Sequence, residues 1–147
     1  MYQRILVATD DSRISRKAVK AAIELAGRLQ ASLVAVHVVP RYPMSYFEGA
    51  VVLSPAEVGR IEKKWMDKGR AMVDAVAAQA QKAGVDARGI LAQSDAPADA
   101  ILAAARKHKC DLIVMASHGR RGLQRVLLGS ETQHVLAHTE LPVLVLR

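Results

Sequence analysis

The feature that most constrains this sequence is a regular alternation of apolar runs with amphipathic segments. Nearly continuous runs of Val, Leu, Ile, Ala and Met cover residues 4–9, 32–38, 111–116 and 143–147, and a weaker run covers 85–91. A short apolar run of this kind is typical of a strand that is buried on both faces. Segments with apolar residues at helical spacing separate the runs. This order predicts an α/β fold, a single Rossmann-like open parallel sheet of five strands with helices on both faces.

Residues that favour helix starts and ends mark the boundaries of the amphipathic segments. We expect helices to begin at Ser12, at the capping box of residues 54–57, at Asp95 with Pro97, and at a second capping box of residues 130–133. The first helix extends to about residue 30, and Gly84 is a suitable residue to follow the end of the second. The last helix is expected from about residue 131 to residue 138, before Pro142.

Length and cysteine content indicate one domain in a reducing compartment. The chain of 147 residues fits a single domain spanning 1–147. Its only cysteine is Cys110, which excludes an internal disulfide. An apolar run starts almost at the first residue, which leaves no room for a signal peptide, and no run is long enough to cross a bilayer. We therefore expect a cytoplasmic protein with no membrane partner.

The chain is basic. Lys and Arg number 21 against 14 Asp and Glu, a net charge of +7, and part of this charge clusters at Arg120, Arg121 and Arg125. Such a balance suits an anionic partner, although it also serves solubility. No aromatic residues interleave with the basic ones, so the sequence offers no stacking platform for single strands and we expect no nucleic-acid partner.

The loop of residues 116–130 is the main candidate for binding chemistry. It contains Gly119, Gly122 and Gly129, and it leads directly into the last helix. Glycines allow the backbone to approach a ligand, and the unpaired amides and dipole of a helix start attract anions. The runs at 4–9 and 111–116 both end in small and polar residues, as adjacent strands at a topological switch point do. Glycines that only serve turns would explain the loop equally well.

These residues carry a resemblance to the universal stress protein family over the whole chain. The ATP-binding branch of that family has the pattern Gly-x2-Gly-x9-Gly-Ser/Thr after its fourth strand. Here Gly119 is followed by nine residues and then by Gly129 and Ser130, whereas Ala116 occupies the position of the first glycine. The segments Ala-Thr-Asp at residues 8–10 and Leu-Pro-Val-Leu-Val near the end also fit the family.

The resemblance implies a sheet of order 3-2-1-4-5, a homodimer formed through the last strand (residues 142–147), and ATP with Mg²⁺ as ligand. It implies the following sites: Ala8, Thr9 and Asp10 beside the adenosine; Val38 at the adenine; Met115, Ala116 and His118 along the ribose and phosphates; Gly119, Gly129, Ser130, Glu131 and Thr132 around the phosphates. At a strand end φ is expected to be negative, so alanine is sterically allowed at position 116 and we expect binding to survive.

Signatures of common enzyme classes are absent. The sequence has no Gly-x4-Gly-Lys-Ser/Thr loop, no Gly-x-Gly-x-x-Gly after the first strand and no Gly-x-Ser-x-Gly elbow. His118 is the only candidate base for attack on a γ-phosphate. We therefore expect a nucleotide-binding module for stress response and signalling, with at most slow ATP hydrolysis. Two alternatives stay open: a dimer that has lost nucleotide binding and only contacts a protein partner, and a weak ATPase.

Three smaller features favour structural roles. His134 and His138 are spaced as a metal pair on a helix, but no third ligand is evident nearby. Asp10 and Asp11 form an acidic pair after the first strand, without the further aspartate and lysine that a receiver domain needs. Cys110 precedes a buried run, where a small apolar residue is expected.

Overall fold

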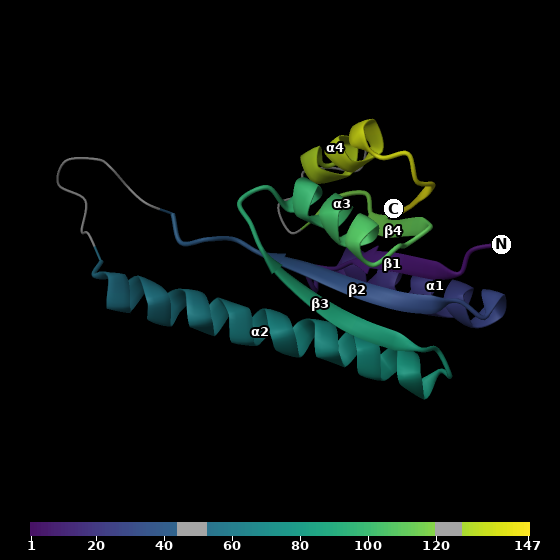
Figure 1. Cartoon of the computed structure of the whole chain (residues 1–147), viewed down its shortest axis with the longest axis horizontal. Coiled ribbons are helices and arrows are strands. Elements are labelled where there is room, and N and C mark those ends of the chain that lie inside the picture. The colour runs from purple at the N-terminus through teal and green to yellow at the C-terminus, as the bar shows by residue number, and fades with distance from the viewer. Residues whose placement is uncertain (44–52, 120–127) are drawn as a thin grey trace.

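A parallel sheet in the order β3-β2-β1-β4-β5 organises the molecule (Figure 1). The structure is a computed structural model that describes residues 1–43, 53–119 and 128–147. Its elements are β1 (Arg4–Ala8), α1 (Arg13–Leu29), β2 (Ser32–Val39), α2 (Pro55–Lys82), β3 (Ala87–Gln93), α3 (Pro97–Lys107), β4 (Leu112–Ala116), α4 (Ser130–His138) and β5 (Val143–Leu146). The order of the strands and the α/β class expected from the sequence are confirmed.

Helices cover both faces of the sheet, because the strands are apolar on both sides. In β1, Ile5 and Val7 face α1 and α2, whereas Leu6 faces α3 and α4. All three side chains are completely buried. Figure 1 shows α2 on one side of the sheet and α3 with α4 on the other. Burial of two independent apolar clusters on a single sheet is the main stabilising contribution that this sequence supplies.

At two of the predicted helix starts, the expected side chain caps the helix. The Ser12 side chain accepts a hydrogen bond from the Ser15 amide and caps α1. At α2 the Ser54 hydroxyl accepts from the Glu57 amide while the Glu57 carboxylate accepts from the Ser54 amide, which completes the capping box. Gly84, just beyond α2, has a φ of +80°, a conformation that glycine adopts without strain.

The other two helices start within a residue of the expected positions, since Pro97 is the first residue of α3 and Ser130 that of α4, but neither is capped by a local side chain. Asp95 does not cap α3; its carboxylate accepts from the Arg41 amide, and Ala96 is the N-cap. The capping box at residues 130–133 does not form, because Gly129 is the N-cap of α4 and Ser130 is already helical. The Gly129 amide donates to the Ser117 carbonyl at 2.7 Å, which fixes the start of α4 from β4. A tertiary contact therefore decides this boundary.

Cys110 lies in the core cluster beneath α3 and α4, with 6% of its surface exposed. Burial raises the pKa of its thiol to about 11. Because the reactive species is the thiolate, this environment makes the side chain inert at ordinary pH. No helix in the described part of the chain is both long enough and apolar enough to span a membrane.

A first prediction concerns the packing of α2 on β3. A Cβ at Gly89 would lie 2.9 Å from the carbonyl carbon of Val73, so Gly89→Ala must displace the α2 backbone and should destabilise the fold by about 1–3 kcal/mol. Gly59, in α2 itself, has nothing within 4 Å of such a Cβ, and Gly59→Ala should stabilise by about 1 kcal/mol. Urea unfolding of both variants measures the two changes in the free energy of unfolding. A loss smaller than about 0.5 kcal/mol for Gly89→Ala would contradict the close packing of α2 on β3.

A second prediction concerns Cys110. Because the pKa of the thiol is about 11, the thiol is almost entirely protonated near pH 8 (~3 pH units lower). The native protein should therefore react with a disulfide reagent far more slowly than the unfolded chain. The measurement is the absorbance of the released thiolate with and without guanidinium chloride. Rapid stoichiometric labelling of the native protein would show that Cys110 is accessible.

Candidate functional site

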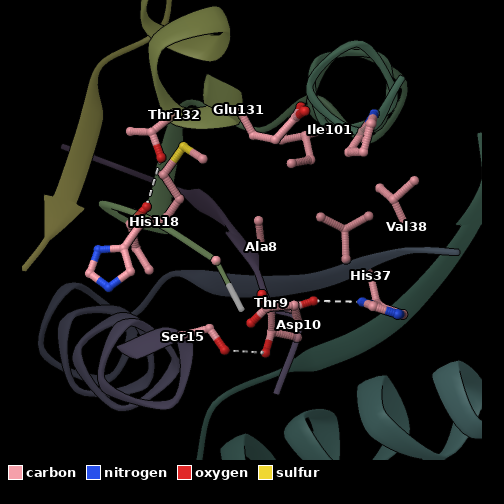
Figure 2. A pocket seen from close by; sticks show the side chains of 15 residues that line it. Ala8, Thr9, Asp10, Ser15, His37, Val38, Ile101, His118, Glu131 and Thr132 are labelled. Atoms are coloured by element: carbon pink, nitrogen blue, oxygen red, sulfur yellow. Dashed lines mark hydrogen bonds between the residues drawn. The ribbon is translucent and has the colours of Figure 1, made fainter. Parts of the chain in front are cut away.

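A pocket lies at the carboxyl ends of β1, β2 and β4, where the order of the strands reverses (Figure 2). Its volume is about 240 Å³. The lining comes from five regions of the chain: Ala8, Thr9 and Asp10 at the end of β1, with Ser15 of α1; Val36, His37 and Val38 of β2; Pro97 and Ile101 of α3; Met115, Ala116, His118 and Gly119 at the end of β4; and Glu131 and Thr132 of α4. This is the position at which open α/β sheets bind their ligands.

One part of the lining is apolar. Figure 2 shows the side chains of Ala8, Val38 and Ile101 projecting into the same region, between the end of β2 and helix α3. Ile101 is also part of the core cluster, so its position is fixed by packing as well. Apolar walls with a few polar groups at their margin are typical of pockets that hold a flat organic ring.

The turn after β1 forms the floor of the pocket through a local hydrogen-bond network. The buried Thr9 hydroxyl lies 3.3 Å from the Ser15 hydroxyl and accepts from the Asp11 amide at 3.2 Å. The Asp10 carboxylate accepts from the Ser12 amide at 2.9 Å. Asp11 adopts a φ of 61°, which Asp tolerates better than most residues, and its side chain pairs with Arg16. These bonds orient Asp10 before any ligand is present.

His37 joins the floor to the second strand. Its Nδ1 lies 2.8 Å from the Thr9 carbonyl oxygen. A carbonyl oxygen only accepts, so Nδ1 carries the proton that is donated. The bond ties β2 to the turn after β1 across the carboxyl end of the sheet. His37 is therefore a structural element of the pocket wall.

On the other side, α4 is attached directly to the end of β4. The buried Thr132 hydroxyl donates to the Ala116 carbonyl at 2.9 Å, and this bond is drawn in Figure 2. Ala116 is the last residue of β4 and does not have a positive φ, which confirms that alanine is sterically allowed there. Its single methyl group takes up space at the pocket wall without straining the backbone.

Gly119 lies close to the Asp10 side chain. A Cβ on this residue would lie 2.8 Å from an oxygen of the Asp10 carboxylate, so a larger residue at position 119 would require the Asp10 side chain to move. Gly129 is similarly close to the backbone of Ser117 and His118. These contacts connect the two ends of the 116–130 loop to the strand ends; residues 120–127, which include Arg120, Arg121, Gly122 and Arg125, lie outside the described residues.

The structure brings most of the predicted site residues together. Ten of them line the pocket: Ala8, Thr9, Asp10, Val38, Met115, Ala116, His118, Gly119, Glu131 and Thr132. Gly129 and Ser130 do not line it, and the Gly129 amide is used by the Ser117 carbonyl. Sequence reasoning missed Ser15, Val36, His37, Pro97 and Ile101, which the pocket also includes. Alternation along the second strand could have indicated Val36, which lies two residues before Val38.

The remaining candidates lie away from the pocket. His134 pairs with Asp99 through Nε2 at 2.8 Å, and His138 Nδ1 lies 2.8 Å from the His134 carbonyl. The two imidazole rings stack with their centroids 4.2 Å apart. Within residues 1–43, 53–119 and 128–147, no group of three or more His, Cys, Asp or Glu side chains is arranged to hold a metal ion.

Comparisons with known proteins cover the whole chain. The model of the universal stress protein family matches residues 1–147. The chain is 33% identical to universal stress protein MJ0531 of Methanocaldococcus jannaschii, over 100% of this chain and 83% of that protein, and 33% identical to universal stress protein YxiE of Bacillus subtilis, over 100% of both.

Solved structures agree with these matches. Universal stress protein UspA of Lactobacillus plantarum superposes with a TM-score of 0.83 at 24% identity, covering 99% of this chain and 98% of that one. A universal stress protein in complex with cAMP superposes with a TM-score of 0.71 at 27% identity, covering 99% and 97%. The family match over the full length, the two curated relatives and the shared fold lead to one conclusion: this chain belongs to the universal stress protein family.

Proposed function

We propose that the protein binds an adenine nucleotide in this pocket and acts as a dimeric module in stress response and signalling. The observation that carries the proposal is the pocket itself, which lies where the order of the strands reverses. It has an apolar wall at Val38 and Ile101 and also includes residues from the start of α4. An apolar wall suits a purine base, and a helix start suits a phosphate. A family member with 27% identity has been solved with cAMP, an adenine nucleotide.

The start of α4 supplies the phosphate end of the proposed site. Gly129 is the N-cap, no side chain caps the helix, and Ser130, Glu131 and Thr132 form its first turn. Amides in the first turn of a helix lack partners within the helix and carry the positive end of its dipole. ATP with Mg²⁺ is the ligand that the family resemblance implies, and the phosphates would lie at this turn.

A third prediction tests the base end of the site. Ala8→Leu should fill the space between Val38 and Ile101 and weaken adenosine and ATP binding at least tenfold (roughly 1.4 kcal/mol), because the added atoms occupy the volume of the ring. The measurement is isothermal titration calorimetry with each ligand. Ala103→Leu, the same change at an exposed position of α3, is the matched control and should bind as the wild type does.

Other outcomes of this titration decide between the remaining hypotheses. Absence of binding to the wild type with every adenine ligand would contradict nucleotide binding and favour a dimer that only contacts a protein partner. Phosphate release during the ATP titration, if it disappears in Ala8→Leu, would instead favour a slow ATPase. Circular dichroism and thermal unfolding of Ala8→Leu separate a blocked pocket from a misfolded chain.

The dimer has its own physical basis. β5 is the last strand at one edge of the sheet, and Leu144 on β5 and Leu136 on α4 are 40% and 41% exposed. An edge strand presents unpaired backbone groups, and exposed leucines beside it add apolar surface that a second copy would cover. We propose that β5 and α4 face the partner subunit.

A fourth prediction follows for this edge. The wild type should sediment as a dimer at micromolar concentration, and Leu144→Lys should sediment as a monomer, since a charge on an edge strand opposes pairing. Ala78→Lys, which introduces the same charge at an exposed position of α2, should leave the dimer intact. A wild-type monomer, or a Leu144→Lys dimer of unchanged affinity, would exclude this interface.

A further inference from the structure

Glu131 connects the pocket to a second helix. It is the second residue of α4 and lines the pocket, and its carboxylate oxygen Oε2 accepts a hydrogen bond of 2.8 Å from the Ala98 amide in the first turn of α3. Figure 2 shows this side chain extending from α4 toward α3, beside Ile101. The starts of α3 and α4 therefore meet at one edge of the pocket, where the Glu131 carboxylate bridges them.

This bond holds the carboxylate in place. The N-cap of α3, Ala96, has no side-chain hydrogen bond to offer, so Glu131 from another helix satisfies the Ala98 amide instead. A carboxylate at a helix start is also favoured by the helix dipole. Movement of the Glu131 side chain into solvent would leave that amide without this acceptor, so a ligand meets a fixed negative charge at this edge.

The fixed charge lies beside the turn that would receive phosphates. Glu131 contributes its own amide to the first turn of α4, and its carboxylate is held on the pocket side of that turn. Among the described lining residues there is no Lys or Arg, and the other carboxylate, Asp10, lies on the opposite side of the pocket. Each further phosphate at the turn is therefore repelled by the Glu131 carboxylate, and no basic side chain of the described wall offsets this repulsion. Its size is that expected for two charges several ångströms apart near a protein surface.

We propose that Glu131 is the residue that sets how strongly this pocket discriminates among adenine ligands by their number of phosphates, favouring those with few. This proposal rests on the proposed nucleotide binding. The property of the ligand that the site selects is its number of phosphates. Two features of this chain act on the pocket independently: the Ala116 methyl takes up space in its wall, and the Glu131 carboxylate adds negative charge.

The fifth prediction tests this discrimination with the full chain. Dissociation constants for adenosine, AMP, ADP and ATP are measured without Mg²⁺ for the wild type and for Glu131→Gln. The glutamine keeps a side-chain carbonyl that can accept from the Ala98 amide, so only the charge changes. The ratio of the ATP to the adenosine dissociation constant should fall about tenfold in Glu131→Gln, with little change for adenosine itself.

Glu140→Gln is the matched control, because it removes one carboxylate beyond the end of α4 and outside the pocket. It should leave the ratio unchanged. An unchanged ratio in Glu131→Gln, with adenosine still bound, would overturn the proposal while leaving nucleotide binding intact. If Mg²⁺ is present and the ratio is higher in Glu131→Gln than in the wild type, Glu131 acts as a metal ligand and the proposal is overturned. Failure of the wild type to bind adenosine would instead contradict the proposed function.

Discussion

The pairing of β1 on both of its edges is the constraint on which the rest of the structure depends. β1 pairs in parallel with β2 on one side and with β4 on the other. Because its central residues are completely buried on both faces, it can only be an interior strand. The chain must then build outward from β1 in both directions, and the connections leave a gap at the carboxyl ends where they diverge. The pocket is a consequence of that geometry.

Attachment of α4 to β4 converts the gap into a shaped site. The Thr132 hydroxyl and the Gly129 amide each bond to a backbone carbonyl at the end of β4. The Thr132 bond is buried, and the Gly129 bond joins two backbone groups. As a result the first turn of α4 lies against the strand ends, and Gly119 lies next to the Asp10 carboxylate.

Charge is distributed unevenly over this molecule. The chain carries a net charge of +7, yet the described wall of the pocket holds Asp10 and Glu131 and no Lys or Arg. Net charge therefore describes how the whole protein meets other molecules, whereas ligand selection depends on a few local groups. Glu131 illustrates the difference, since one carboxylate serves as a cap for α3 and as a charge at the pocket.

The sequence by itself determined the fold class, the order of elements and most of the pocket, because apolar runs, helix caps and strand-end residues act locally or through burial on both faces. Ser12 and Ser54 cap their helices as their neighbours predict. Only the tertiary structure decided which groups hold the starts of α3 and α4, since the Ala98 amide donates to Glu131, a residue 33 positions away, and the Gly129 amide donates to the Ser117 carbonyl. It also decided that Ser15, His37 and Ile101 belong to the pocket. Such contacts join segments distant in the chain, and no local pattern encodes them.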